Sequence, residues 1–168
     1  YAISLQELRR DLEESITWIK HVTIKRSLHG MLEIHITEKE PFAQFFNGEA
    51  IFLINQEGEE ITQFIEDKYK NLLIFFGDQA NIYAKDLTQL IEEADFSHNI
   101  RKAELVEKRR WNLHLSNGVV IRLPETQPEL AIKTLQKMQE RQNINILSDT
   151  YEYIDMRIKG RIYIKPRI

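Results

Sequence analysis

Hydrophobic residues recur at two different spacings in the first 40 positions of the chain. From Leu5 to Ile16 they lie three or four residues apart, which is typical of one face of a helix. Ser4 and Glu7 fit a capping box, in which each side chain accepts a hydrogen bond from the other's backbone N–H. From residue 22 to residue 36 apolar and polar residues alternate, which predicts two strands joined by a turn at His29-Gly30. A helix with two short strands is too small to bury a core alone.

The alternating pattern resumes after a segment that contains a proline. Residues 38 to 45 indicate a stiff junction, because Pro41 restricts both itself and Glu40 to extended conformations. Beyond it, AIFLINQEGEEI predicts a hairpin around Glu57-Gly58. The run LLIFFG, residues 72 to 77, predicts a short strand buried on both faces. A helix is expected from about Asp78 to Ala94, with its apolar residues on one face.

The stretch RRWNLHLSNGVVIRLPE, residues 109 to 125, predicts a second hairpin whose register has two alternatives. A two-residue Asn-Gly turn would set Ile121 opposite His114, which mixes apolar and polar residues on each face. A three-residue loop that ends at Gly118 instead pairs Leu113 with Ile121 and unites the apolar residues on one face. It also places glycine where a left-handed residue is needed. We therefore predict the three-residue loop.

A third helix and two strands complete the pattern. Thr126 and Glu129 fit another capping box, and Pro128 lies in the first turn, where proline is tolerated. The apolar contacts of this helix are expected from Leu130, Leu135 and Met138. The two strands are joined by a turn at Lys159-Gly160. Their apolar residues alternate, with Ile154, Met156 and Ile158 on the first and Ile162 and Ile164 on the second.

Composition narrows the class of protein. The chain has 168 residues, of which 42% are hydrophobic and 29% charged, as in globular proteins with one ordinary domain or two small ones. Its net charge of −3 argues against a general nucleic-acid binder. Residues 157–168 nevertheless hold five basic residues and no acid, so this segment is a candidate contact surface for an acidic partner.

The lack of cysteine, the lack of a long apolar run and the identity of the first residue bear on where the protein works and whether the chain is complete. The chain has no cysteine, which excludes disulfides and thiol chemistry and suits an oxidising compartment, although many cytosolic proteins also lack cysteine. No run of about 18 apolar residues is present to span a membrane. The chain begins without methionine, at YAISLQEL, and is therefore expected to be a fragment of a longer protein.

Candidate catalytic patterns are weak. The five histidines have no metal-ligand spacing. The acidic clusters at residues 57–60 and 92–95 are sequence neighbours in a turn and at a helix end, whereas a glycosidase needs two carboxylates facing each other across a cleft. No glycine-rich phosphate loop or nucleophile elbow is present. We expect no catalytic site, no metal and no cofactor.

Several segments, taken in this order, resemble one family. They are LQELRRDLEESITWIKHVTIKRSLHGMLEIHITEKEPFAQF, FLINQEGEEI, LLIFFG, RRWNLHLSNGVVIRLPE and YIDMRIKGRIYI. Together they resemble the extracytoplasmic region of the bacterial cell-division family FtsQ/DivIB. The segment from Glu38 to Phe45 resembles the family's Glu-Arg/Lys-x-Pro-x-Ala junction. The combination of RRWNL, SNG and LPE is the most specific part of the resemblance.

The resemblance implies an α+β fold in two parts. Residues 1–40 would be the second half of a POTRA domain, without its first strand and helix. Residues 41–168 would form a β domain, a curved and mostly antiparallel sheet with packed helices and a C-terminal edge strand. The parent protein would be anchored in the inner membrane by one upstream helix that this chain lacks, with this region in the periplasm and enriched at the division septum.

The implied function is a non-enzymatic scaffold of the divisome. Its β domain would bind the FtsB and FtsL membrane proteins, and its POTRA domain would serve recruitment, with an FtsK-type protein as a candidate recruiter. No nucleic acid is expected. An alternative is a POTRA-bearing transport or secretion module that handles unfolded polypeptide. A cell-wall enzyme is a third hypothesis.

The last strand is the favoured contact surface. Such a strand usually lies at a sheet edge, where Lys, Arg and Pro can simply prevent unwanted pairing. The same open edge can accept a partner strand, and the resemblance favours that reading. It implies contacts at Arg157, Ile158, Gly160, Arg161, Ile162 and Tyr163. It adds Arg109 beside Trp111, although that arginine can equally form a salt bridge and the tryptophan can pack in the core.

Overall fold

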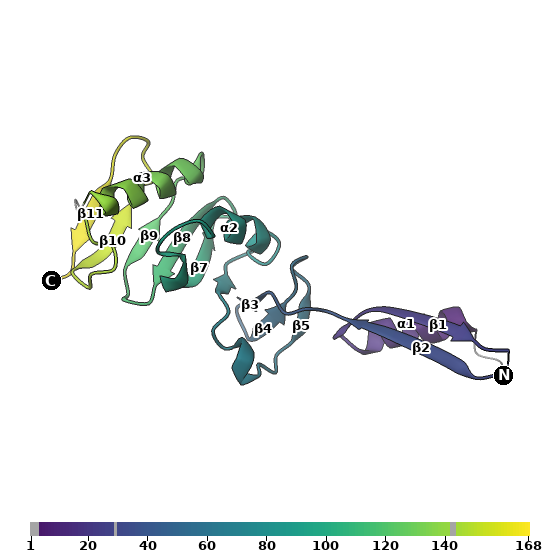
Figure 1. The fold of residues 1–168 in the computed structure, drawn as a ribbon. Coiled ribbons are helices and arrows are strands. Elements are labelled where there is room, and N and C mark those ends of the chain that lie inside the picture. Colours follow the sequence, from purple (N-terminus) through teal and green to yellow (C-terminus); the bar gives the residue numbers. More distant parts are fainter. Residues whose placement is uncertain (1–3, 29, 142–143) are drawn as a thin grey trace.

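The computed structural model describes residues 4–28, 30–141 and 144–168, so the predicted turn residue His29 lies outside the described residues. The helices are α1 (Leu5–Ser15), η1 (Asp67–Tyr69), α2 (Ala84–Ile91), η2 (Ser97–Asn99) and α3 (Pro128–Glu140). The strands are β1 (Ile19–Arg26), β2 (Leu32–Glu38), β3 (Ala43–Phe46), β4 (Ile51–Ile54), β5 (Glu60–Thr62), β6 (Ile74–Phe76), β7 (Ile100–Val106), β8 (Arg110–Leu115), β9 (Val120–Arg122), β10 (Tyr151–Asp155) and β11 (Tyr163–Pro166). Figure 1 shows an elongated molecule with α1, β1 and β2 at one end.

The elements α1, β1 and β2, here called the N-terminal unit, agree with the periodicity of the sequence. The capping box is confirmed, because the Ser4 hydroxyl accepts from the Glu7 N–H at 3.1 Å and the Glu7 carboxylate accepts from the Ser4 N–H at 3.2 Å. β1 and β2 form an antiparallel two-stranded sheet of their own. Ile19 and Val22 are buried, but every residue of β2 is exposed. The core of this unit is therefore small.

The remaining strands form one nine-stranded sheet, here called the main sheet, in the order β11-β10-β9-β8-β7-β6-β3-β4-β5. Its neighbouring pairs are antiparallel except for β3–β6, β6–β7 and β9–β10, which are parallel. The α+β class is confirmed, with a mixed sheet. Strands β3, β6, β7, β9 and β10 run in the same direction, so their carboxyl ends meet along one rim of the sheet.

The core lies between the main sheet and the helices α2 and α3 (Figure 1). Leu87 of α2 and Leu135 of α3 are buried in the same cluster as Phe75, Leu113 and Ile154 of the strands. α3 is also tied to the segment that follows α2, because the side-chain amide of Gln136 donates to the backbone oxygen of Glu93 at 3.1 Å. One face of the sheet thus carries the helices.

The hairpin of β8 and β9 has the predicted three-residue loop. Leu113 pairs with Ile121, and the Leu115 N–H donates to the Val119 oxygen at 2.9 Å. Gly118 has a φ of +82°, as a left-handed loop residue requires. The two-residue alternative is therefore wrong.

Two helix starts differ from the prediction because residues other than glycine adopt positive φ. α2 begins at Ala84 rather than near Asp78, since Gln79 has a φ of +65° and residues 78–83 form turns. α3 is preceded by Gln127 with a φ of +56°, which serves as the N-cap without a side-chain hydrogen bond. The capping box of Thr126 and Glu129 is therefore wrong. Positive φ at glutamine cannot be read from local sequence.

Two burial predictions also need correction. In the run LLIFFG only Phe75 is fully buried, while its strand neighbours Ile74 and Phe76 are half-buried, because the helices cover one face of the sheet. On α3, Leu135 is buried as predicted, but Leu130 is 52% exposed. Ala131 and Ile132 take the core-facing positions next to it.

Candidate functional site

β11 is the outermost strand of the main sheet, next to β10. The prediction that the last strand lies at a sheet edge is confirmed, although the strand begins at Tyr163 and so does not include Ile162, which was assigned to it. Ile164 pairs with the buried Ile154, whereas Tyr163 and Lys165 lie opposite Asp155 and Tyr153 on the other face. The Lys165 ammonium makes an ion pair with Glu152 at 2.6 Å.

The backbone of β11 has one outward N–H that is free to pair. The Arg167 N–H donates to the Thr150 oxygen on the β10 side at 2.7 Å, so Arg167 faces inward. Backbone groups alternate along an antiparallel strand. Tyr163 and Lys165 therefore also face inward, and Ile164 faces outward, as does Pro166, which has no N–H. No strand of the described chain lies on that side.

Asp155 determines how the chain leaves β10. Its carboxylate accepts hydrogen bonds from the backbone N–H of Arg157 at 3.1 Å and from the guanidinium of Arg157 at 2.6 and 2.9 Å. The residue is only 8% exposed. Burial would by itself raise the pKa of Asp155, but the hydrogen bonds from Arg157 and the nearby charge of Arg122 hold the pKa below its usual value. The Met156 N–H still donates to the Arg122 oxygen of β9 at 2.9 Å, so the Asp155–Arg157 pair fixes the backbone at the point where the chain leaves the sheet.

These residues, 156–162, connect β10 to β11 and form one wall of a groove. The Arg161 N–H donates to the Ile158 oxygen at 3.0 Å, and Gly160 has a φ of +74°, so the predicted turn at Lys159-Gly160 exists within this longer connection. The groove has a volume of about 360 Å³. It is lined by residues 156–162 on one side and by Pro124, Thr126, Gln127, Leu130, Ala131 and Thr134 on the other.

The groove has an apolar interior and a basic border. Ile158, predicted to alternate inward with Ile154 and Met156, is instead 54% exposed beside the exposed Leu130. None of the described residues that line the groove is acidic. Among the described residues, Lys159 and Arg161 have no acidic partner, and the Arg161 guanidinium donates a hydrogen bond to the Tyr163 hydroxyl at 3.4 Å. Arg157, in contrast, is already paired with Asp155.

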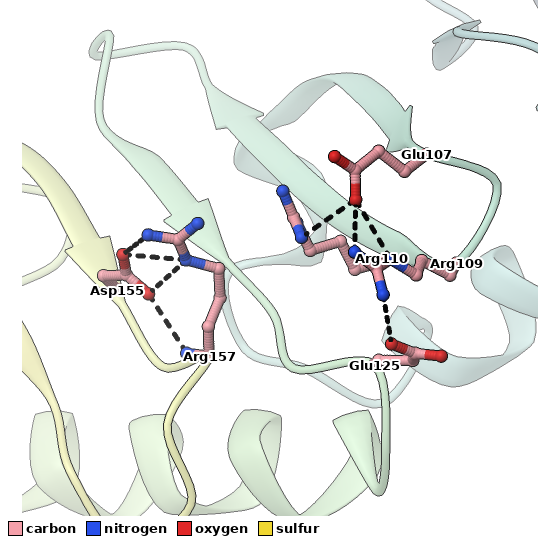
Figure 2. Close-up of polar contacts among 6 residues, drawn as sticks. All are labelled: Glu107, Arg109, Arg110, Glu125, Asp155 and Arg157. Carbon is pink, nitrogen blue, oxygen red and sulfur yellow. Dashed lines mark hydrogen bonds and ion pairs between the residues drawn. The ribbon is translucent and has the colours of Figure 1, made fainter.

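Arg109 and Arg110 belong to a separate cluster at the same rim of the sheet. Figure 2 shows the Glu107 carboxylate between the two arginines, with Arg109 also facing Glu125. The Arg109–Glu125 distance is 3.5 Å. The hydrogen bond from Arg109 lowers the pKa of Glu107. Two arginines thus face two carboxylates, so this cluster has little net charge to offer a partner.

The side chain of Trp111 packs against the hydrophobic core. It is half-buried against the core, and its ring packs edge-on against that of Phe75, with 5.8 Å between the ring centroids. This is the core-packing alternative stated for the tryptophan. Its contact with a partner remains a prediction.

The structure therefore divides the predicted contact residues into two groups. Arg157, Ile158, Gly160, Arg161 and Ile162 line the groove, and Tyr163 follows on the edge strand. Trp111 lies in β8, and Arg109 immediately precedes this strand. Figure 2 draws no interaction between the Arg109 cluster and the Asp155–Arg157 pair. Glu125, the ion-pair partner of Arg109, stands in the sequence between the groove residues Pro124 and Thr126.

One residue of the groove, Leu130, and the residue that precedes the groove segment, Asp155, were not predicted from the sequence as part of this site. Leu130 could have been found as an exposed apolar residue only if the start and rotation of α3 had been known. Asp155 carries a weak signal, since an aspartate two residues before an arginine at the end of a strand can accept from both its backbone and its side chain.

The described residues contain no group of three or more His, Asp or Glu side chains that could hold a metal ion. The acidic turn at residues 57–60 is engaged in ion pairs, Glu57 with Lys20 and Glu59 with Lys39. Within the described ranges, no helix is both long enough and apolar enough to cross a bilayer.

Comparison with known proteins gives a consistent family. A family model described as "Cell division protein FtsQ/DivIB, C-terminal" matches residues 45–157. The chain is 32% identical over 166 residues to the cell division protein FtsQ of Rickettsia bellii, covering 98% of this chain and 61% of that protein. It is 28% identical over 165 residues to FtsQ of Rhizobium meliloti, covering 98% of this chain and 52% of that protein. The chain thus spans about half to three fifths of the length of these relatives.

Among solved structures, the major extracytoplasmic domain of the cell division protein DivIB from Geobacillus stearothermophilus aligns with a TM-score of 0.39 and 11% sequence identity. The alignment covers 65% of this chain and 99% of that one.

Proposed function

Since the chain belongs to the FtsQ/DivIB family of cell division proteins, we propose that it is a non-enzymatic scaffold of the bacterial divisome. Its main sheet binds the membrane proteins FtsB and FtsL, and its N-terminal unit, as part of a POTRA domain, serves recruitment by an FtsK-type protein. The region works in the periplasm at the division septum, attached to the inner membrane through a preceding helix of the parent protein.

The observation that carries this proposal is the open edge of β11 beside the groove. An extended partner segment can add a strand to such an edge, with affinity from backbone hydrogen bonds and specificity from side-chain pockets. Ile164 offers an outward N–H and C=O on the strand. The groove next to the start of β11 offers an apolar surface made by Leu130 and Ile158.

The charges of this surface favour an acidic partner segment. Lys159 and Arg161 border the groove without acidic partners of their own in the described chain. Exposed ion pairs contribute only about 0 to 1 kcal/mol each. The charges therefore select and orient the partner, while backbone pairing and an apolar anchor supply most of the affinity.

The test is a pair of substitutions at Ile164. Proline removes the outward N–H and is tolerated at an edge position whose N–H faces solvent, whereas alanine removes the same side chain and keeps the N–H. We expect Ile164→Pro to weaken binding of the FtsB periplasmic segment at least about tenfold. Ile164→Ala should weaken it less than about threefold. Calorimetric titration of the folded variants measures both.

Equal affinity of the proline and alanine variants would exclude strand addition at β11. Binding of many unrelated unfolded peptides with similar affinity would instead favour the transport or secretion module. Turnover of peptidoglycan fragments, abolished by one carboxylate substitution, would favour a cell-wall enzyme.

A further inference from the structure

The connection between the N-terminal unit and the main sheet is very short. The Lys39 N–H donates to the Trp18 oxygen at 2.8 Å, so Lys39 is still held by the N-terminal unit. The Phe42 N–H donates to the Ile54 oxygen at 2.8 Å, so Phe42 already belongs to the main sheet. Only Glu40 and Pro41 lie between the residues that make these two hydrogen bonds. Pro41 restricts the backbone of both, so the connection is stiff.

Two ion pairs cross this connection. The Lys39 ammonium lies 3.1 Å from the Glu59 carboxylate, and the Lys20 ammonium lies 3.7 Å from the Glu57 carboxylate. Both lysines belong to the N-terminal unit, and both glutamates belong to the turn between β4 and β5. The Lys39 side chain is only 16% exposed, although it is charged and lies at the surface of both units.

The acidic turn is built to hold its carboxylates in place. The side chain of Asn55 is buried; its oxygen accepts from the backbone N–H groups of Glu57 at 3.1 Å and Glu59 at 2.8 Å. Its amide donates to the Glu59 carboxylate at 2.9 Å. The turn is fixed from behind as well, since Asn81 donates to the Gly58 oxygen at 2.8 Å.

We propose that Lys20, Lys39, Glu57 and Glu59 form an ionic lock that fixes the orientation of the N-terminal unit relative to the main sheet. Charged side chains at the surface are usually solvated and need no such support. Here a buried asparagine orders the acidic turn, and a lysine that is largely shielded from solvent pairs with it. The lock holds the two units as one body at low ionic strength. Because the Lys20–Glu57 pair is exposed and screened by salt, the orientation loosens as ionic strength rises.

The absence of cysteine from the sequence allows a direct test on the whole chain. Cysteines introduced at the exposed positions Lys25 on β1 and Gln89 on α2 take spin labels, one on each unit. Pulsed electron paramagnetic resonance then gives the distribution of distances between the units. We expect a single narrow distribution for the protein with an intact lock.

Breaking the lock should broaden this distribution. For Glu59→Gln and for Lys20→Glu, the ratio of the locked orientation to all others should fall about fivefold. The double variant Lys20→Glu/Glu57→Lys restores the opposite charges and should return the narrow distribution. A rise to about 0.5 M salt should produce part of the same broadening.

Glu14→Gln is the matched control, because Glu14 pairs with Arg10 at 3.8 Å within α1 alone. It should leave the distribution unchanged. The proposal is overturned if the unaltered protein already has a broad distribution, or if the lock variants keep the narrow one. The measurement uses no partner, so its outcome is independent of the proposed binding function.

Discussion

At the scale of single residues, the carboxylate of Asp155 meets three donor groups of Arg157 and lies 3.6 Å from the guanidinium of Arg122. The sequence-based prediction identified the basic segment after Asp155 and treated Arg157 and Arg161 alike as partner contacts, with Lys159 only in the turn. The structure distinguishes them by their partners. Arg157 is paired with Asp155 at the end of β10. Lys159 and Arg161 border the groove and have no acidic partner within the described residues.

We predict that Asp155→Asn lowers the free energy of unfolding at pH 7 by about 1 to 2 kcal/mol, because it weakens hydrogen bonds of a mostly buried carboxylate. The pKa of Asp155 is depressed in the folded protein. Its contribution is therefore complete above the usual carboxyl pKa of about 3.9 and is lost as the pH falls through the lower folded value. The difference in unfolding free energy between the variant and the parent protein should therefore become smaller below pH 4.

Urea unfolding at pH 7 and at several acidic pH values measures this gap. Glu152→Gln serves as the control, since Glu152 is an exposed ion-pair partner of Lys165, and it should change stability by less than about 0.5 kcal/mol. A gap for Asp155→Asn that stays constant through the acidic range would show that its charge contributes nothing.

At the scale of elements, the sequence predicted what alternation and helical spacing control. The β8–β9 register followed from uniting apolar residues on one face, and the cap of α1 followed from its side chains. The starts of α2 and α3 were misplaced, because Gln79 and Gln127 adopt positive φ. Both glutamines are exposed, and their backbone oxygens accept turn hydrogen bonds from the N–H groups three residues later. No local residue pattern predicts positive φ at glutamine.

Two glycines at element ends should respond differently to alanine. At Gly118, with a φ of +82°, a Cβ would meet only the flexible Arg167 guanidinium, so we expect a loss of about 1 kcal/mol in unfolding free energy. At Gly77, with a φ of +104°, a Cβ would lie 2.3 Å from the Leu105 backbone oxygen on β7. There we expect a loss above about 3 kcal/mol. Equal losses in thermal or urea unfolding would contradict this account of the β6 end.

At the scale of the whole molecule, the order of strands was beyond reach of local patterns. β3 pairs in parallel with β6 on one side and antiparallel with β4 on the other, although β4 and β5 separate β3 from β6 in the sequence, and β10 joins β9 in parallel. The groove depends on this arrangement, because it needs α3 and residues 156–162 on the same side of the sheet end. The resemblance of five ordered segments to a family supplied the expectation of an edge strand that alternation alone left undecided.

The edge strand and the groove also determine which features the proposed partner needs. A partner that binds as proposed would present an extended segment to β11 and, next to it, an apolar side chain with acidic neighbours to the groove. The helix-covered face and the Arg109 cluster are occupied by the protein's own contacts. Strand addition at β11 is therefore the central claim.

Amide hydrogen exchange at Ile164, measured by nuclear magnetic resonance with and without a saturating FtsB periplasmic segment, tests that claim most directly. In the free protein the outward N–H of Ile164 should exchange rapidly, while the inward N–H groups of Tyr163 and Lys165 are protected. On binding, exchange at Ile164 should slow at least about 100-fold. Unchanged exchange at Ile164 while the segment is fully bound would contradict the account.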